Sequence, residues 1–191
     1  MASSNPQLLS REERIASLRG RVEIVELLHT MNKPTIAMMR GWAVGAGMSI
    51  ALACDLRYGD ITTKLKTGFI ELGLSGDFGG HYFLSRIVGS AKARELYLLS
   101  AVIGAEKAEQ LNILNAVYEV DELELAVVKI AEKLATRSKT AMTYIKQNLN
   151  MAANISLSEM LDEEIIRHIA CTESEEFSQA TKSFAKKRDN S

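Results

Sequence analysis

The chain has 191 residues, which is enough for one domain with a substantial hydrophobic core. Its 23 Lys and Arg residues balance 24 Asp and Glu residues, so the net charge of -1 gives no basic field of the kind that binds nucleic acid or an anionic membrane surface. Apolar residues make up 47% of the chain, but no apolar run approaches the length of a membrane span, and the first residues lack the apolar core of a signal peptide.

A helix is the first element that the sequence predicts. Ser10 and Glu13 have the spacing of a capping box, and apolar residues then recur at helical spacing as far as Leu28. We expect this helix to end near Asn32, because the following Lys-Pro pair disfavours helix. Strands are then expected at 35–39, 56–58, 65–69 and 117–120. Helices are expected at 48–53, 80–88, 91–99, 105–111, 122–137 and 139–153. Two capping boxes, Ser156 with Glu159 and Thr172 with Glu175, predict the starts of two more helices.

The first of these strands, at 35–39, is apolar on both faces. We therefore expect it to lie buried between neighbours that complete its hydrogen bonds, although the chain offers few strands to flank it. No repeat or linker divides the chain, and the mixed order of elements predicts an α/β fold with a helical region after residue 120. Cys54 and Cys171 are too few and too far apart for a disulfide framework or a zinc site, so we expect a reduced, cytoplasmic setting.

Three glycines, Gly41, Gly45 and Gly47, separate the strand at 35–39 from the helix at 48–53. A strand that turns through glycines into a helix leaves main-chain N–H groups unpaired at the helix N-terminus, which favours negative charge. Glycines also allow a ligand to approach the main chain closely. The alternative is a tight strand–helix turn that binds nothing.

Two longer runs extend this pattern. KPTIAMMRGWAVGAGMSIALACDLRYGD, at 33–60, resembles the central motif of the crotonase (enoyl-CoA hydratase/isomerase) family. GLSGDFGGHYFLSRIVGSAKARELYLLS, at 73–100, resembles that family's next motif, and ESEEFSQATKSFAKKR, at 173–188, resembles its C-terminal helix. The resemblance begins near residue 20, so the family's opening third, with several strands and one oxyanion donor, has no counterpart here.

This resemblance implies the architecture and the ligand. We expect a crotonase-like ββα spiral core, without its N-terminal part, over residues 1–120, followed by a C-terminal helical trimerisation region over 121–191. The implied substrate is an acyl-CoA thioester, with coenzyme A as part of the substrate and with no separate cofactor or metal. Members of the family stabilise a thioester enolate with two main-chain N–H groups, and the position that matches the second donor is Ala46. The implied assembly is a homotrimer or a dimer of trimers, with no nucleic acid or membrane partner.

Acid–base chemistry requires a titratable group near the acyl carbons. The two catalytic glutamates of the family's hydratases match Ser49 and Phe69, so neither carboxylate is present. Asp77 matches the Asp that the dienoyl-CoA isomerase and 4-chlorobenzoyl-CoA dehalogenase branches use as base or nucleophile; the alternative is an N-cap of the following helix. Glu71, expected on the same side of an extended segment as Phe69, is a second candidate, and its alternative is a surface or subunit-contact carboxylate. His81 is a runner-up proton carrier.

Other residues are expected to bind the substrate. Those around the two glycine-bearing motifs are Trp42, Gly45, Ser49, Phe69 and Gly76. In the C-terminal helix, Phe184 and Lys187 match an aromatic residue and a lysine that help hold coenzyme A in the family, partly across the trimer contact. For Lys187 the alternative is a solvated basic end of the helix.

Two functions remain open from the sequence. The first is an acyl-CoA-binding enzyme of the enoyl-CoA hydratase/isomerase type, whose exact reaction and acyl chain the sequence does not define. The second is an inactive or impaired crotonase-like subunit for binding or assembly, which the missing glutamates favour. A plain helical interaction module is disfavoured, because it gives no reason for Gly45 and Gly47 to flank the start of a helix.

Overall fold

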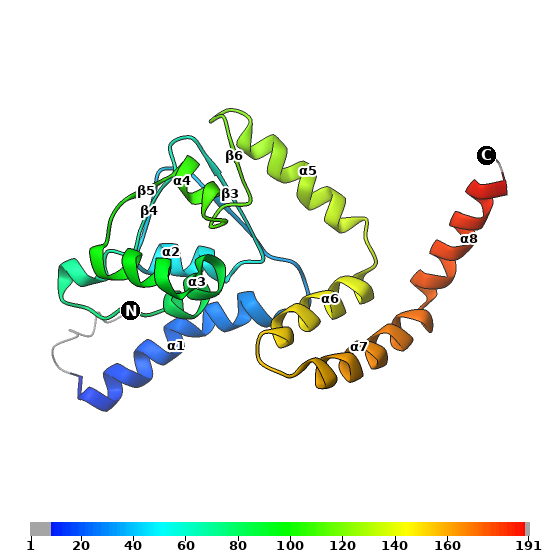
Figure 1. Ribbon diagram of the computed structural model, residues 1–191, viewed down its shortest axis with the longest axis horizontal. Coiled ribbons are helices and arrows are strands. Elements are labelled where there is room, and N and C mark those ends of the chain that lie inside the picture. The colour runs from blue at the N-terminus through cyan, green and yellow to red at the C-terminus, as the bar shows by residue number, and fades with distance from the viewer. Residues whose placement is uncertain (1–8, 190–191) are drawn as a thin grey trace. The chain divides into compact units, whose positions relative to one another are not determined.

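The structure is a computed structural model that describes the backbone of residues 9–189 and the side chains of residues 9–184 (Figure 1). It divides into two compact units. One unit comprises the residues up to His29 together with Thr35–Val127, and the other comprises Thr30–Pro34 and the residues from Val128 onward. The division therefore falls inside a helix near residue 127, and a short connecting segment groups with the helices of the second unit.

The first unit is a mixed α/β structure. In chain order its elements are α1 (Arg11–Thr30), β1 (Ile36–Met39), β2 (Trp42–Val44), α2 (Ala46–Ala53), β3 (Leu56–Asp60), β4 (Lys64–Lys66), the 3-10 helix η2 (Phe69–Leu72), α3 (Gly80–Leu99), β5 (Ile103–Gly104), α4 (Ala105–Gln110), β6 (Ala116–Tyr118) and the start of α5 (Leu123–Ala135). The predicted α/β class is confirmed, and so is the capping box at the start of α1, where Ser10 and Glu13 exchange hydrogen bonds.

Two three-stranded sheets hold the first unit together. One has the order β1-β3-β6 with both pairs parallel, and Ile36 lies opposite Leu56. The other has the order β2-β4-β5, with β2 parallel and β5 antiparallel to β4. The expectation that the strand at 35–39 is enclosed on both sides is wrong. Within the described residues β1 pairs only with β3, and Met38 is 45% exposed while Met39 is buried.

The glycine-bearing elbow contains a strand that the sequence did not predict. Gly41, with a φ of 62°, ends β1, and Gly45, with a φ of 56°, ends β2. Residues with a side chain rarely adopt these φ values, so the backbone conformation favours glycine at both positions. Because the chain turns at each of them, β2 fits between β1 and the helix, and α2 begins at Ala46, two residues before the predicted start.

The main core lies between α2, α3 and the strands. Leu84 is fully buried in the first half of α3, and Ala93 and Leu96 are buried in its second half. The two halves meet at Gly89, whose φ of 77° and ψ of 158° are not helical. The predicted break of this helix at Gly89 is therefore confirmed. Figure 1 shows α2 and α3 close together on one side of the strands.

The segment predicted as a strand over 65–69 is a strand only as far as Lys66. Gly68 then adopts a left-handed φ of 70° and starts η2, and Gly73, with a φ of 67°, ends it. A 3-10 helix turns once every three residues, whereas a strand alternates its side chains every two residues. Side chains two residues apart in this segment therefore point in different directions.

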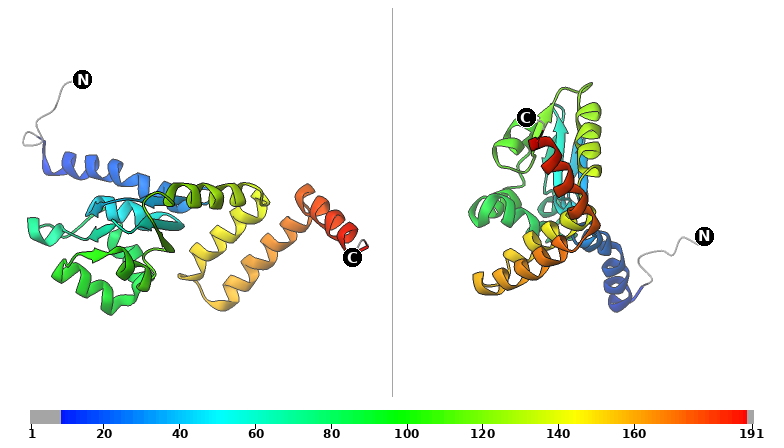
Figure 2. Two further views of the ribbon diagram at one scale, coloured as in Figure 1. Left: turned by 90° about the horizontal axis from the view of Figure 1, so that it is seen from above. Right: turned by 90° about the vertical axis from the view of Figure 1, so that its right-hand side faces the viewer.

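The second unit is helical. Its main elements are α6 (Lys139–Ala152), α7 (Leu157–Thr172) and α8 (Glu175–Asp189). Figure 2 shows α6 and α7 side by side as an antiparallel pair, and the two helices are in contact. No helix among the residues that the structure describes is both long enough and apolar enough to pass through a membrane.

Side-chain caps define the starts of these helices. Ser156 and Glu159 form the predicted capping box at the start of α7, which confirms it. The box predicted for Thr172 with Glu175 is wrong, because Thr172 is the last residue of α7. Instead, Ser174 accepts a hydrogen bond of 3.2 Å from the N–H of Phe177 and serves as the cap of α8.

Candidate functional site

The start of α2 carries the main-chain donor that the sequence analysis singled out. The first helical hydrogen bond runs from the N–H of Ser49 to the carbonyl of Gly45, at 3.0 Å. The N–H groups of Ala46, Gly47 and Met48 therefore precede the helical hydrogen bonds. Within the part of the chain that the structure describes, no acceptor is found for the Ala46 N–H. This helix end favours a negatively charged or polarised oxygen.

Phe69 packs between the two glycine-bearing segments. Its ring is buried, and a Cβ built on Gly45 would lie 3.5 Å from Phe69 Cζ. A Cβ built on Gly76 would lie 3.3 Å from Cδ2 of the same ring. Behind it, the N–H of Gly68 donates a 3.0 Å hydrogen bond to the hydroxyl of Ser100 at the end of α3. The phenyl ring thus joins the start of α2 to the loop that precedes α3.

Asp77 lies in that loop, next to Gly76. Its Oδ1 atom is buried and has no hydrogen-bond partner among the described residues. The alternative that its side chain caps the following helix is wrong: Gly79 is the N-cap of α3, with a φ of 67°, and no side chain bonds there. The N–H of Gly80 bonds instead to the main-chain carbonyl of Asp77, at 3.3 Å. A buried carboxylate oxygen without a partner is costly, so it points to a functional role.

Tyr97, on the second half of α3, is a member of this cluster that sequence reasoning missed. Its hydroxyl is hydrogen-bonded to the side chain of Ser49, which is 2% exposed and also bonds to the carbonyl of Gly45 at 3.1 Å. A Cβ on Gly80 would overlap with both Tyr97 Oη and Ser49 Oγ. Burial is the main cause that raises the pKa of Tyr97 above its usual 10.0; the bond from Ser49 opposes the shift, and the charge of Asp77 adds to it.

The imidazole of His81 lies against the same tyrosine. The two rings are stacked, with centroids 4.0 Å apart and an interplanar angle of 16°. A Cβ built on Gly76 would lie 2.7 Å from His81 Cε1, so the imidazole also lies against the turn that carries Asp77. The structure therefore brings together Gly45, Ser49, Phe69, Gly76, Asp77, His81 and Tyr97.

Glu71 does not join this cluster. It lies in η2 with its side chain 53% exposed, and its Oε1 atom is 2.5 Å from Lys66 Nζ. The expectation that it shares a face with the buried Phe69 is wrong, because the segment is a 3-10 helix rather than a strand. The ion pair agrees with the alternative of a surface carboxylate.

Trp42, on β2, is 58% exposed, and its ring centroid lies 5.4 Å from Lys64 Nζ.

The two expected residues of the C-terminal helix lie in the second unit. Phe184, on α8, is 73% exposed. The side chain of Lys187 falls outside the described residues. No group of three or more His, Cys, Asp or Glu side chains that could hold a metal ion occurs within the described part of the chain.

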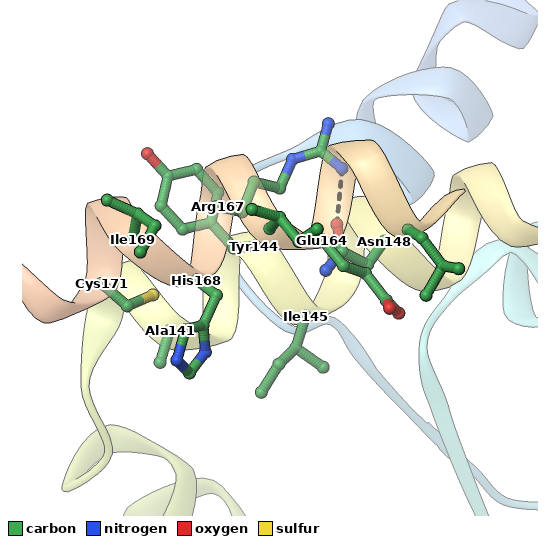
Figure 3. Close-up of a pocket in the computed structure, with 11 residues that line it drawn as sticks. Ala141, Tyr144, Ile145, Asn148, Glu164, Arg167, His168, Ile169 and Cys171 are labelled. Carbon is green, nitrogen blue, oxygen red and sulfur yellow. Dashed lines mark hydrogen bonds between the residues drawn. The ribbon is translucent and has the colours of Figure 1, made fainter. Parts of the chain in front are cut away.

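The second unit has a groove of its own between α6 and α7, with a volume of about 560 Å³ (Figure 3). Figure 3 shows Arg167 reaching Asn148, and the Nη1–Oδ1 distance is 2.5 Å. The same guanidinium lies 2.9 Å from Oε2 of Glu163, on the same helix. Because the only arginine of the groove is already paired with these two groups, the groove offers little free positive charge to an anionic ligand.

Little in the sequence indicated that Tyr97 belongs to the candidate site. It stands 16 positions after His81 in the chain, and the helix between them bends at Gly89. The stack of the two rings depends on the angle between the halves of α3, which no local pattern reveals. An aromatic residue in an apolar helix is typical of an ordinary core residue.

Known proteins resemble this chain over most of its length. The family model described as Enoyl-CoA hydratase/isomerase matches residues 11–191. A short-chain-enoyl-CoA hydratase of Clostridium acetobutylicum is 30% identical over 87% of this chain and 64% of that protein. A 1,2-epoxyphenylacetyl-CoA isomerase of Escherichia coli is 31% identical over 86% of this chain and 63% of that protein. The chain thus spans a little under two thirds of the length of these relatives.

Solved structures show the same likeness. An enoyl-CoA hydratase from a Polaromonas species superposes with a TM-score of 0.88 at 28% identity, over 93% of this chain and 69% of the other. A protein of Thermobifida fusca, solved in complex with acetoacetyl-CoA, gives a TM-score of 0.81 at 30% identity, over 83% of this chain and 62% of the other. The crotonase-like fold expected from the sequence is confirmed.

Proposed function

The chain belongs to the enoyl-CoA hydratase/isomerase family, and from this we propose that it binds acyl-CoA thioesters and acts on them as an enzyme of the hydratase or isomerase type. One observation carries the proposal. The N–H of Ala46 at the start of α2 and the buried Oδ1 of Asp77 both lack a partner among the described residues, and they belong to one cluster, which Phe69 and Tyr97 join.

We infer that the N–H of Ala46 donates to the thioester carbonyl oxygen. When a proton leaves the carbon next to that carbonyl, negative charge builds on the oxygen, and a fixed donor at a helix start stabilises it. Ala46 is suited to this role because the donor is main chain and precedes the helical hydrogen bonds. A donor of this kind contributes roughly a hundredfold or more to the rate.

Asp77 is the group that we propose moves the proton. The positions of the two hydratase glutamates hold Ser49, whose hydroxyl bonds to the carbonyl of Gly45, and the buried Phe69, so neither supplies a carboxylate. A shift of a double bond between two carbons needs one base that removes and returns a proton, whereas water addition is helped by a second group. Among the described residues Asp77 supplies the one carboxylate of this cluster, and this favours an isomerase reaction over hydration.

We further propose that the second unit mediates self-association, as a homotrimer or a dimer of trimers. The α6–α7 pair exposes a set of aliphatic side chains, each between 48% and 69% exposed: Ile145, Leu149, Leu161, Ile165, Ile166 and Ile169. An apolar surface of this extent is unusual on a monomer, and a second copy of the chain would cover it. Phe184 would then be available to a coenzyme A molecule bound at a subunit contact. A cytoplasmic setting fits the two free cysteines.

Turnover by the purified chain tests the enzyme proposal. We expect conversion of a 3-enoyl-CoA to the 2-enoyl-CoA, with crotonyl-CoA hydration measured in parallel. Asp77→Asn should lower kcat by roughly a hundredfold or more, since a positioned acid–base group contributes about that much. Asp121→Asn is the matched control, because Asp121 is an exposed carboxylate outside the cluster, and it should leave the rate unchanged. Full activity in Asp77→Asn would remove Asp77 from the mechanism.

The alternative is a binding or assembly subunit without catalytic activity. It is supported by Ser49 and Phe69 at the glutamate positions. Calorimetric binding of acetoacetyl-CoA together with the absence of turnover of either enoyl-CoA would favour it. Absence of binding to every acyl-CoA tested would reject both functions.

A further inference from the structure

Tyr97 connects the two segments that carry the proposed chemistry. Its hydroxyl bonds to Ser49, one turn along the helix that begins at Ala46. The bond passes close to Gly80, where any Cβ would collide with both hydroxyl groups. Gly80 is the first residue of α3, directly after the loop that carries Asp77. The hydroxyl of Tyr97 thus lies between the start of α2, to which it bonds, and the start of α3, which it contacts closely.

The ring of Tyr97 makes the second connection. It stacks on His81 at 4.0 Å, and His81 in turn lies against Gly76, where a Cβ would lie 2.7 Å from the imidazole. Gly76 directly precedes Asp77 and has a φ of 105°, a conformation that only glycine adopts readily. The stack therefore stabilises the turn at Gly76, which sets the direction of the Asp77 side chain.

Core packing alone does not hold these rings. Tyr97 and His81 both line a hollow of about 450 Å³, whose remaining lining residues are Ser85, Ser90, Ala93, Arg94 and Leu98. Tyr97 packs against the core on one side, but the hollow leaves its other side open, so its hydrogen bond and its stack also contribute to its position. Loss of either should let the Asp77 turn shift relative to the start of α2.

We propose that Tyr97 is a positioning residue that fixes the Asp77 carboxylate relative to the Ala46 N–H through its hydrogen bond to Ser49 and its stack on His81. This inference rests on the proposed acyl-CoA function and deepens it. Catalysis depends on the alignment of a base with the reacting carbon while the oxygen is held by its donor, and small displacements are costly. Tyr97 itself need not touch the substrate.

Kinetics of matched variants test the inference. Tyr97→Phe removes the hydroxyl and keeps the stack, and Ser49→Ala removes the other partner of the same bond. Each should lower kcat for 3-enoyl-CoA by about threefold to tenfold, the equivalent of one hydrogen bond, with KM within about twofold of the wild type. The double variant should lose no more than Ser49→Ala alone, because Ser49→Ala already removes the bond to Tyr97 together with the bond to the Gly45 carbonyl. Tyr118→Phe removes a tyrosine hydroxyl outside the cluster and should keep the wild-type kcat.

Other outcomes are distinguishable. If the wild type is active and Tyr97→Phe matches it in kcat, the positioning role is wrong while the proposed function stands. Multiplying losses in the double variant would show that Tyr97 and Ser49 act separately, and a raised KM with unchanged kcat would indicate a substrate contact; either result overturns the inference. A wild type that neither binds nor converts acyl-CoA rejects the proposed function and this role with it. Melting curves of every variant exclude loss of folding as the cause.

Discussion

Gly80→Ala probes the junction between α2 and α3 without changing a polar group. Gly80 does not have a positive φ, so alanine brings no backbone strain, and the effect comes from its methyl group alone. That methyl group would overlap with Tyr97 Oη and Ser49 Oγ and would lie 3.3 Å from Ser49 Cβ. We expect the substitution to separate the two hydroxyl groups and to destabilise the first unit.

The expected magnitude follows from three contributions. Overpacking of a dense site costs about 1–3 kcal/mol. Loss of the bond between Tyr97 and Ser49 adds about 0.5–1.5 kcal/mol. Alanine regains at most about 1 kcal/mol over glycine in a helix interior, and less at the first position of α3. The free energy of unfolding should therefore fall by about 1–3 kcal/mol.

Urea denaturation followed by circular dichroism measures this change. Gly20→Ala is the control for helix propensity, because Gly20 lies within α1 with no atom within 4 Å of its added Cβ. It should raise the free energy of unfolding by about 0.5–1 kcal/mol. In a Tyr97→Phe background the cost of Gly80→Ala should shrink, since one of the two colliding atoms is gone. A Gly80→Ala variant as stable as the wild type, or a cost that Tyr97→Phe leaves unchanged, would refute the packing argument.

Three further substitutions have defined outcomes. Leu84→Ala should lower the free energy of unfolding by about 2–5 kcal/mol in urea denaturation, because Leu84 is fully buried in the core of the first unit. Ser156→Ala should lower it by about 1 kcal/mol through loss of the capping box with Glu159. Glu176→Gln should reduce the acid sensitivity of the second unit, measured by circular dichroism against pH. The hydrogen bond from Ser138 is the main cause that lowers the pKa of Glu176, so its stabilising contribution is present above the unfolded value of 4.5 and is lost as the pH falls through the folded pKa.

Each of these has a matched control. Leu98→Ala should cost little, since Leu98 is 68% exposed. Equal losses in Leu84→Ala and Leu98→Ala would contradict the assignment of the core. Ser183→Ala, within α8, should not reproduce the loss of the cap. Glu175→Gln changes the neighbouring carboxylate, which contacts Gln179 on its own helix, and should leave the acid transition in place. An acid transition that Glu176→Gln does not alter would place the titrating group elsewhere.

Local features of the fold were predictable because they depend on neighbouring residues. The capping boxes of Ser10 and Ser156 and the break at Gly89 each follow from the chemistry of one or a few side chains. The starts of α3 and α6 were also close to prediction, since polar or glycine-rich segments precede apolar helical patterns.

Features that depend on distant segments were not predictable. The exposure of β1 follows from the order of its sheet, which places one partner strand beside it among the described residues. The strand β2 forms because β4 lies alongside it, although its three residues show no clear pattern by themselves. Tyr97 joined the candidate site only through the bend of α3 and the closeness of Gly80 to α2. In each case tertiary packing decided the outcome.

The buried oxygen of Asp77 leads to one more prediction, in which stability and activity change in opposite directions. If Asp77 served the fold, as a helix cap does, its replacement would destabilise the protein. Gly79 occupies the cap position instead, and Oδ1 of Asp77 has no partner among the described residues. A buried carboxylate oxygen without a partner costs about 1–3 kcal/mol, and the desolvation cost of a neutral amide of the same shape is smaller. Asp77→Asn should therefore unfold at the same or a higher urea concentration than the wild type, by up to about 1 kcal/mol, while its turnover of 3-enoyl-CoA falls. A clear loss of stability in Asp77→Asn would instead assign the carboxylate to the architecture of the loop, and the fall in turnover would then no longer identify it as the proton carrier.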